Sequence, residues 1–307
     1  MPTTCPVCDG DSFAVHREVR SRLSAIPAGL DRGLLVNVRI ERCRRCGLFR
    51  TVHLSDQRDA ATLYQQDSVC FDASVSKVSL AGQDSAGSTD EMSLLNRLPP
   101  ADLLDVGCGA GHFLLRAASR GYSVTGIDLD DRAIDYVRGV LHLDAHRGTL
   151  DALDSGRRFD VITAFGVLEH LEDPASFLAA ARDRLATGGE ILLGVPNARS
   201  VNRWVSRLSR HDWDMFLEPG HLYHYDSRSL EALACRAGLR RSRWRTATMV
   251  IRGKVPILPS RVPALERSVR ALTQQPAIGR SYRSALALLD RARLGDMLYA
   301  VFEPQNP

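Results

Sequence analysis

The sequence predicts an α/β protein with a doubly wound, mostly parallel sheet and a small cysteine-rich module ahead of it. From residue 102 onward, short apolar runs alternate with segments of helical periodicity, which is typical of parallel strands joined by helices. Before residue 55, two Cys-x-x-Cys pairs flank an alternating segment at 34–40 that is expected to form a strand.

Within the larger region, strands are expected at 103–106, 123–128, 159–165 and 190–195, and helices at 113–120, 133–141 and 175–185. A helix at 229–237, a strand at 244–251 and a last strand at 296–302 follow, with a helical insertion at about 255–294. The long detour before the last strand predicts a hairpin at the sheet edge.

The chain is expected to divide into a module at 1–55, a lid or linker at 56–98, and a main domain at 99–307. The middle segment holds a helical patch at 60–66, with Tyr64 as a candidate lid residue. A polar run at 81–90 then indicates a linker before a helix at 91–98.

Composition limits the class of protein. The chain has 307 residues, 44% of them hydrophobic and 25% charged, as in ordinary globular proteins. Neither a long apolar stretch nor a signal-peptide pattern is found, so a cytoplasmic location is expected, where seven cysteines indicate thiols or metal binding. All but two of the 40 basic residues are arginine, so the net charge of +4 is discounted as a nucleic-acid signal.

A glycine-rich turn, Asp105-Val106-Gly107-Cys108-Gly109-Ala110-Gly111, lies where the first strand is expected to meet the first helix. Asp128 follows at the tip of the next strand, where a carboxylate can bind the two hydroxyls of a ribose. The turn alone fits a nicotinamide site, an adenosyl site or tight packing. The position of the third glycine in a dinucleotide fingerprint is occupied here by His112, which disfavours the nicotinamide site. The alternative roles are a helix cap for Asp105 and a solvated loop acid for Asp128.

Together with the segments 159–170 and 185–191, this turn resembles the class I S-adenosylmethionine (SAM) dependent methyltransferases. The resemblance implies a mostly parallel seven-stranded sheet with an antiparallel last strand, and SAM as cofactor. The residues it places near SAM are Asp105, Gly107, Cys108, Gly109, Gly111, His112, Phe113, Asp128, Leu129, Thr149, Leu150, Phe165, Gly166 and His170.

Within that set, the resemblance gives roles to particular positions. Asp105 and its glycines line the methionine end of SAM, Asp128 binds the ribose, and Leu129 packs on the adenine. Phe165 and Gly166 border the sulfonium. Thr149 and Leu150 stand where the family usually has an acidic residue for the adenine amino group; threonine departs from that pattern, and Asp151 is the substitute.

Candidate catalytic residues are His170, His221, His224 and Tyr223. A histidine beside the acceptor can remove a proton near neutral pH, and a tyrosine can position the acceptor. His170 can alternatively orient its loop or cap the next helix. The aromatic residues of the segment 219–225 can alternatively serve packing.

Four cysteines, Cys5, Cys8, Cys43 and Cys46, are candidate ligands of a structural zinc ion, because four sulfur ligands leave no open position. The intervening residues 9–42 exceed the roughly 15 to 20 of compact zinc ribbons, which favours a strand-rich insertion. The alternative is incidental thiols.

A zinc module ahead of this fold resembles the C-methyltransferases of deoxysugar pathways and their relatives, which implies a natural-product or sugar-type small-molecule acceptor. In those enzymes a Glu-His pair serves proton abstraction. Here Gly220-His221 stands at the equivalent place, so the glutamate is missing. The chain is expected to be a monomer or homodimer.

Two rival functions stay open. One is a zinc-ribbon ribosomal or transfer RNA methyltransferase that grips phosphates through arginines near the second cysteine pair, although a solvated arginine face is favoured. These are Arg39, Arg42, Arg44, Arg45 and Arg50. The other is a non-catalytic SAM-binding or zinc-dependent interaction protein.

Overall fold

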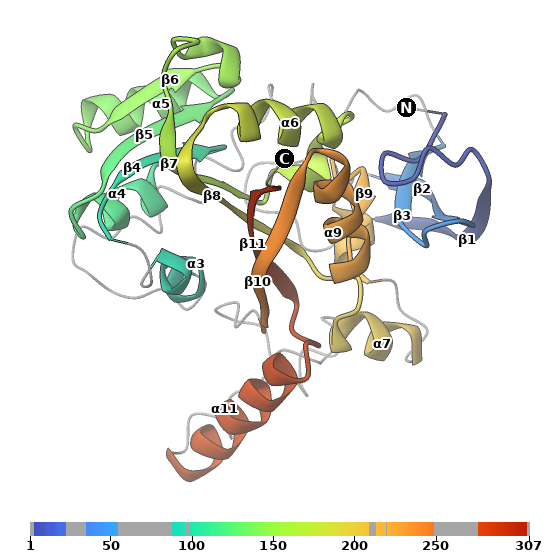
Figure 1. The fold of residues 1–307 in the computed structure, drawn as a ribbon. Helices are drawn as coiled ribbons and strands as arrows, with labels where there is room; N and C mark the ends of the chain where they lie inside the picture. Colours follow the sequence, from blue (N-terminus) through green and yellow to red (C-terminus); the bar gives the residue numbers. More distant parts are fainter. Residues whose placement is uncertain are drawn as a thin grey trace.

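The computed structural model describes residues 3–22, 35–54, 88–95, 99–208, 213–218, 220–248 and 276–305. A large sheet with flanking helices occupies the centre of the molecule, and a small sheet near the N-terminus lies at its side (Figure 1). The helical patch at 60–66, Tyr64 and the first part of the predicted insertion, up to residue 275, lie outside the described residues.

The large sheet has seven strands in the order β10-β11-β8-β7-β4-β5-β6. The five central and distal strands, from β8 to β6, pair in parallel, whereas β11 runs antiparallel to both β8 and β10. The strands are β4 Asp102–Val106, β5 Ser123–Asp128, β6 Asp144–Arg147, β7 Phe159–Phe165, β8 Leu185–Pro196, β10 Leu239–Ala247 and β11 Met297–Pro304. The predicted fold class, with its antiparallel last strand, is confirmed.

Helices connect these strands, and local sequence explains where several of them begin. The carboxylate of Asp130 accepts a hydrogen bond at the start of α5, and that of Asp173 does so at α6, just before Pro174. Asp226 and Ser229 form a capping box at α9. The helices are α3 Ser88–Leu95, α4 His112–Ala118, α5 Asp131–Gly139, α6 Pro174–Asp183, α7 Val201–Leu208, α8 Asp214–Leu217, α9 Ser227–Arg236 and α11 Pro276–Arg291, with short 3₁₀ turns η1 Leu150–Ala152 and η2 Leu168–His170.

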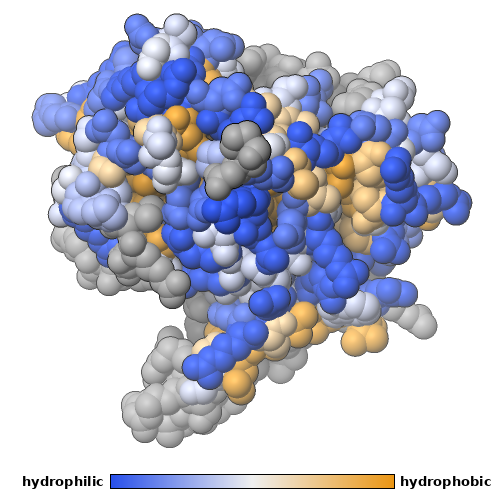
Figure 2. All heavy atoms as spheres, in the orientation of Figure 1, coloured by the Kyte–Doolittle hydropathy of each residue, from blue (hydrophilic) through white to orange (hydrophobic). Residues whose placement is uncertain are grey.

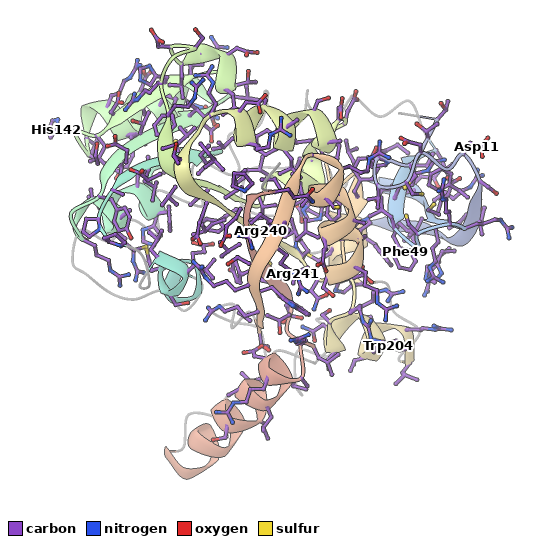
Figure 3. All side chains as sticks on the ribbon, in the orientation of Figure 1. Asp11, Phe49, His142, Trp204, Arg240 and Arg241 are labelled. Carbon is purple, nitrogen blue, oxygen red and sulfur yellow. The ribbon has the colours of Figure 1, made fainter. Side chains whose placement is uncertain are left out.

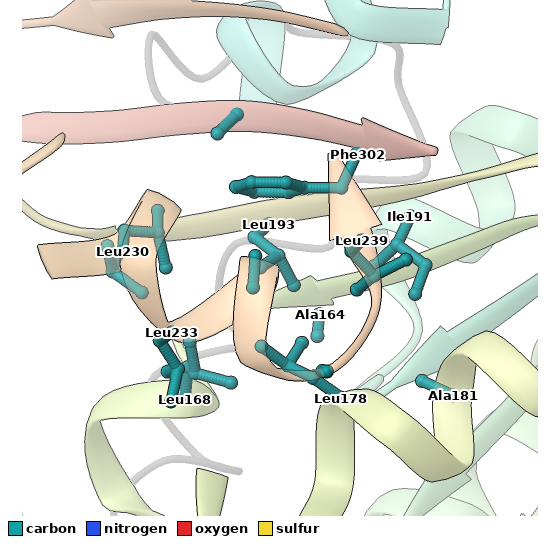
Figure 4. Packing of buried hydrophobic residues seen from close by; sticks show 14 of the residues in the cluster. Ala164, Leu168, Leu178, Ala181, Ile191, Leu193, Leu230, Leu233, Leu239 and Phe302 are labelled. Carbon is teal, nitrogen blue, oxygen red and sulfur yellow. The ribbon is translucent and has the colours of Figure 1, made fainter. Parts of the chain in front are cut away.

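The main core lies between the large sheet and the helices α6 and α9. Leu178 on α6 and Leu233 on α9 pack with Leu193 of β8 and Phe302 of β11, all of them almost fully buried (Figure 4). Burial of side chains of this size is the dominant stabilising term in such a layer. This packing holds the η2 turn, which includes Leu168, against the sheet.

The small sheet is antiparallel, in the order β1-β2-β3-β9, where β1 is Phe13–Arg22, β2 is Leu35–Cys43 and β3 is Phe49–His53. Its fourth strand, β9 (Tyr223–His224), comes from the far end of the chain and pairs Phe49 with His224. The N-terminal segment therefore shares one sheet with residues of the main region. The long strands β1 and β2 agree with the predicted strand-rich insertion between the cysteine pairs.

Several predicted element limits were wrong. The strand predicted at 244–251 begins at Leu239, because α9 ends at Arg236 and the chain turns through Gly238 with φ +74°. The predicted linker overlaps α3, which begins at Ser88. The sequence pattern did not indicate β3, β6, β9 or α7, whose apolar residues are few or lie at the surface.

Figure 2 shows a mostly hydrophilic face on which apolar side chains appear in separate patches, one of them over α7. Trp204 and Leu208 of this helix are exposed, and the side chain of Trp204 is labelled at α7 in Figure 3. On the edge strand β10, Arg240 pairs with Glu303 and Arg241 with Glu231; charged side chains of this kind oppose edge-to-edge association of sheets. In the described part of the chain, no helix is long and apolar enough to cross a membrane.

Candidate functional site

The glycine-rich turn joins β4 to α4 at the carboxyl ends of the parallel strands. The backbone N–H groups of Gly107 and Cys108 donate to the carbonyl of Ile127, at 2.8 and 3.1 Å, which fastens the turn to β5. Gly107, Gly109 and Gly111 have φ values of +71°, +50° and +75°, in the left-handed region that favours glycine. The turn therefore depends on its glycines for its shape.

Asp128 ends β5 and holds the turn from the other side. Its Oδ2 accepts from the Gly109 N–H at 2.8 Å, and its Oδ1 accepts from the Asp130 N–H at 2.9 Å. Its carbonyl also accepts from the N–H of Gly148, at 2.8 Å. The carboxylate is half-buried, so remaining lone pairs can reach a ligand while it orders the loop. The predicted juxtaposition of this acid with the glycine turn is present.

Asp105, the last-but-one residue of β4, is buried beneath the turn. Thr163 Oγ1 on β7 donates to Asp105 Oδ1 at 2.6 Å. Burial raises the pKa of Asp105 to about 7, with a further upward contribution from the charge of Asp128, while the Thr163 hydrogen bond lowers it. A cationic group bound above this carboxyl would favour its ionised form. Asp105 does not cap α4, whose N-cap residue is Gly111.

The other predicted residues around the turn differ in what their side chains reach. Phe113 packs edge-on against Phe165, with 5.1 Å between ring centroids, and both rings belong to one apolar cluster. The Cys108 side chain points toward Gly126 and burial raises the pKa of its thiol, so it serves packing. His112 is half-buried at the start of α4. Gly166 is exposed with φ +70°.

The predicted adenine side lies after β5 and β6. Leu129, which follows Asp128, is 59% exposed. Thr149 and Asp151 are exposed, whereas Leu150 is buried in the main core cluster. Leu150 can therefore meet a ligand through its backbone but not by offering its side chain.

Three predicted histidines lie close together, although they come from η2 and from the segment around β9. The ring centroids of His170 and His221 are 4.7 Å apart, and those of His221 and His224 are 6.2 Å apart. The His170 Nδ1 lies 2.9 Å from the Gly220 carbonyl oxygen, and the His221 Nδ1 lies 3.2 Å from that of Met215. A carbonyl oxygen only accepts, so each of these two rings carries its hydrogen on Nδ1.

Burial keeps these rings neutral. It lowers the pKa of His170 to about 4 and that of His224 to about 3, and it holds the pKa of His221 well below its usual range. A neutral imidazole has one nitrogen lone pair able to accept a proton or a metal ion. In His224, Nε2 is 2.8 Å from the Thr51 hydroxyl oxygen of β3.

Two polar residues of this cluster were missed by sequence reasoning. Glu169 is 2% exposed, and burial raises its pKa to about 8. It lies beside His170 and His221, so the structure supplies a carboxyl group where the sequence pattern lacked one next to His221. Thr51 reaches His224 from the N-terminal sheet. The place of Glu169 in the Leu-Glu-His segment was a sequence signal that could have identified it. No spacing rule predicts the contact of Thr51 with His224.

The tyrosines of this segment are tied to the η2 region. The Tyr223 hydroxyl donates to the Glu172 carbonyl at 3.4 Å, and burial raises its pKa to about 12. The Tyr225 hydroxyl donates to the Leu168 carbonyl at 3.5 Å. Both rings are buried in the main core cluster, so their surroundings are those of packing residues.

The four predicted cysteines converge at one end of the small sheet. All four Sγ atoms lie within 4.8 Å of one another, and the Cys5–Cys46 and Cys8–Cys43 pairs are each 3.5 Å apart. Sulfur ligands of one tetrahedral zinc ion, with bonds of about 2.3 Å, stand roughly 3.8 Å apart. The donor set therefore fits zinc. Cys5 and Cys43 are buried in the same core cluster as Tyr223 and Tyr225.

The arginines near the second cysteine pair mostly have partners within the protein. Arg39 pairs with Glu18 and Arg50 with Glu41, at 2.9 and 2.7 Å. Arg42 and Arg45 donate to backbone carbonyls, and Arg44 is exposed. These contacts do not support a dedicated phosphate-binding surface.

Sequence comparison relates this chain to known proteins. A family described as "Methyltransferase domain" matches residues 86–241, just over half of the chain. The Ubiquinone biosynthesis O-methyltransferase of Cereibacter sphaeroides is 33% identical over 139 residues, which is 39% of this chain and 56% of that protein. The protein of the same name from Nitrosomonas europaea is 31% identical over 151 residues, 43% and 63% of the two chains. The chain thus spans less than two thirds of the length of these curated relatives.

Solved structures with a similar chain trace include a putative methyltransferase from Bacillus halodurans, with 16% identity, 72% of this chain and 100% of that chain covered, and a TM-score of 0.49. A TehB-like SAM-dependent methyltransferase from Corynebacterium glutamicum has 20% identity, 76% and 96% coverage, and a TM-score of 0.43.

Two glycines of the turn should differ in what an added methyl group does. An ideal Cβ on Gly111 would lie 2.7 Å from Val137 and 2.9 Å from Leu141, whereas one on Gly109 meets no described atom within 4 Å. Gly111→Ala should lower the free energy of unfolding by about 2 to 5 kcal/mol, from strain and overpacking, and Gly109→Ala by about 1 to 2 kcal/mol, from strain alone. Urea unfolding measures both; equal losses would contradict the assignment of Gly109 to open space.

Proposed function

Because the chain belongs to the class I SAM-dependent methyltransferases, we propose that it transfers the methyl group of SAM to a small-molecule acceptor. The observation that carries this proposal is the hydrogen bond from the Gly109 N–H to the Asp128 carboxylate. It joins a left-handed glycine turn to the acid at the next strand tip, an arrangement that can bind the ribose of an adenosyl ligand.

On the cofactor side, Asp105 and the backbone of Gly107 and Gly109 would bind the methionine end of SAM. Asp128 would bind the ribose, and the exposed Leu129 would cover the adenine. Phe165 and Gly166 would border the sulfonium, with Gly111, His112 and Phe113 shaping the helix start beneath it. The open space around Gly109 supports this placement, since a side chain there would fill room that a ligand can occupy.

SAM supplies an activated methyl group on a sulfonium leaving group. The protein's own contribution is to exclude water and align the acceptor, which is worth about 7 to 11 kcal/mol in favourable cases. His170 and His221 are the proposed proton acceptors, because both rings are neutral and oriented by backbone carbonyls. His224 and Tyr223 would act as positioning residues, since their polar atoms are engaged by Thr51 and Glu172.

The acceptor is proposed to be a natural-product or sugar-type small molecule. Relatives named for O-methylation in ubiquinone biosynthesis support a small-molecule acceptor. The internal partners of Arg39, Arg42, Arg45 and Arg50 disfavour the RNA alternative.

The four cysteines are proposed to hold a structural zinc ion. Their convergence supports this, and a full set of sulfur ligands leaves no position for an acceptor. We further propose that residues 1–55 form a zinc module that supports the acceptor side through β9, and that 56–98 and 99–307 form a lid or linker and the methyltransferase domain.

Calorimetric titration with SAM tests the proposed function. The wild-type chain should bind SAM and the demethylated product, and should transfer labelled methyl groups to an acceptor in a cell extract. Asp128→Ala should weaken SAM binding by about a hundredfold or more, because the ribose contacts and the order of the glycine turn are both lost. Zinc content should be unchanged. Preferential binding of a nicotinamide dinucleotide would refute the proposal.

SAM affinity should rise with pH through the pKa of Asp105, which is about 7. Below that pH the carboxyl is neutral and must lose a proton to meet a cationic ligand, so affinity should fall by up to about tenfold per pH unit. Asp105→Asn should abolish the dependence, after the ligand's own titration is subtracted. Thr163→Val, which removes a hydrogen bond to the ionised form, should move the midpoint upward; an unmoved midpoint would exclude Asp105 as its source.

Loss of one sulfur ligand should affect the acceptor side as well as zinc. Cys43→Ser should reduce zinc content from one ion per chain, measured by atomic absorption, and should lower acceptor turnover more than SAM affinity, because β3 supports β9. Cys235→Ser is the matched control, since Cys235 is exposed and is not one of the four clustered cysteines. Retention of full zinc by Cys43→Ser would contradict the ligand assignment.

A further inference from the structure

Glu169, His170 and His221 bring three ligand atoms within 4.8 Å of one another, away from the four cysteines. Glu169 and His170 belong to η2, and His221 precedes β9; the Leu222 N–H donates to the Glu169 carbonyl at 2.7 Å and ties the two segments together. The two segments are therefore held in register independently of any ligand.

The Glu169 carboxyl points to a missing partner. Glu169 is 2% exposed, and its Oε2 has no hydrogen-bond partner among the described residues. A buried carboxyl oxygen without a hydrogen-bond partner destabilises the folded protein. An ion bound between Glu169 and the two imidazoles would satisfy it.

Two of the histidines make the backbone hydrogen bond that metal-ligating histidines commonly make. The Nδ1–H groups of His170 and His221 face the carbonyl oxygens of Gly220 and Met215. Metal-ligating histidines typically donate their second ring nitrogen to such a backbone oxygen, which fixes the ring and places the lone pair on Nε2. His224 differs, because its Nε2 faces the Thr51 hydroxyl.

We propose that Glu169, His170 and His221 form a second metal site, for a divalent transition-metal ion. Two imidazoles and one carboxylate suit zinc, cobalt, nickel, manganese or ferrous iron, and three protein ligands leave positions open. Zinc–nitrogen bonds of about 2.1 Å require the three ligand atoms to close toward one ion. A bound ion would occupy the Nε2 lone pairs of His170 and His221, so these rings would accept a proton only in the metal-free protein. An open metal position would take an acceptor oxygen instead; that role, unlike metal binding itself, rests on the proposed methyl transfer.

The test uses the full chain with its cysteine cluster loaded with zinc, titrated with cobalt(II) chloride in a calorimeter and a spectrophotometer. Wild type should bind one cobalt ion per chain, with weak visible bands and without the intense thiolate-to-cobalt band of a cysteine site. Glu169→Gln and His221→Gln should each weaken cobalt binding by about tenfold or more.

Glu172→Gln is the matched control, because Glu172 is exposed and lies three residues beyond Glu169. It should bind cobalt as wild type does. SAM titration of every variant separates folding and cofactor binding from metal binding. If a variant does not fold, the number of cobalt ions bound per zinc-loaded wild-type chain decides whether the site exists. Absence of cobalt uptake by zinc-loaded wild type, a thiolate spectrum, or unchanged affinity in both folded ligand variants would overturn the proposal, whether or not methyl transfer is found.

Discussion

The parallel pairing of β4 with β5 is the constraint on which the cofactor side of the molecule depends. It places the carbonyl of Ile127 under the N–H groups of Gly107 and Cys108, and it brings the Asp128 carboxylate to the N–H of Gly109. Because the strands of a parallel sheet end at the same edge, the pairing of the strands brings residues that are far apart in sequence close together there. The buried Asp105 lies beneath the same turn and is held by β7 through Thr163.

Burial shapes the chemistry of the second cluster. The three histidines and Glu169 all lie where the charged form of each group is disfavoured, so the imidazoles stay neutral and the carboxyl holds its proton more tightly. Backbone carbonyls, rather than charged side chains, orient His170 and His221. The cluster is thus a set of neutral hydrogen-bond donors and acceptors. Its imidazoles bind protons less tightly, and its carboxyl group more tightly, than solvated residues of the same types.

Much of this molecule was predictable from local pattern. The glycine turn, Asp128 and the four cysteines were found because each follows a spacing rule, and the strand at 159–165 is a mostly apolar run. The proximity of Glu169 to His221 was not predictable, because it depends on how the chain between residues 171 and 220 returns to η2. The strand β9 was missed for a related reason: two residues have no periodicity, and their pairing partner lies about 170 positions earlier. The roles of these residues stay predictions.

The strand β9, which a late segment of the chain contributes to the N-terminal sheet, also limits how the chain can be divided. β9 completes the small sheet, and the Thr51 N–H donates to the Leu222 carbonyl at 3.0 Å. A fragment beginning after residue 54 would strip β9 of its hydrogen-bonding neighbour and uncover Tyr223 and Tyr225. Such a fragment would expose an unpaired strand edge to which other copies could bind. Exchange of this module between homologous proteins would therefore have to include β9 together with the N-terminal strands.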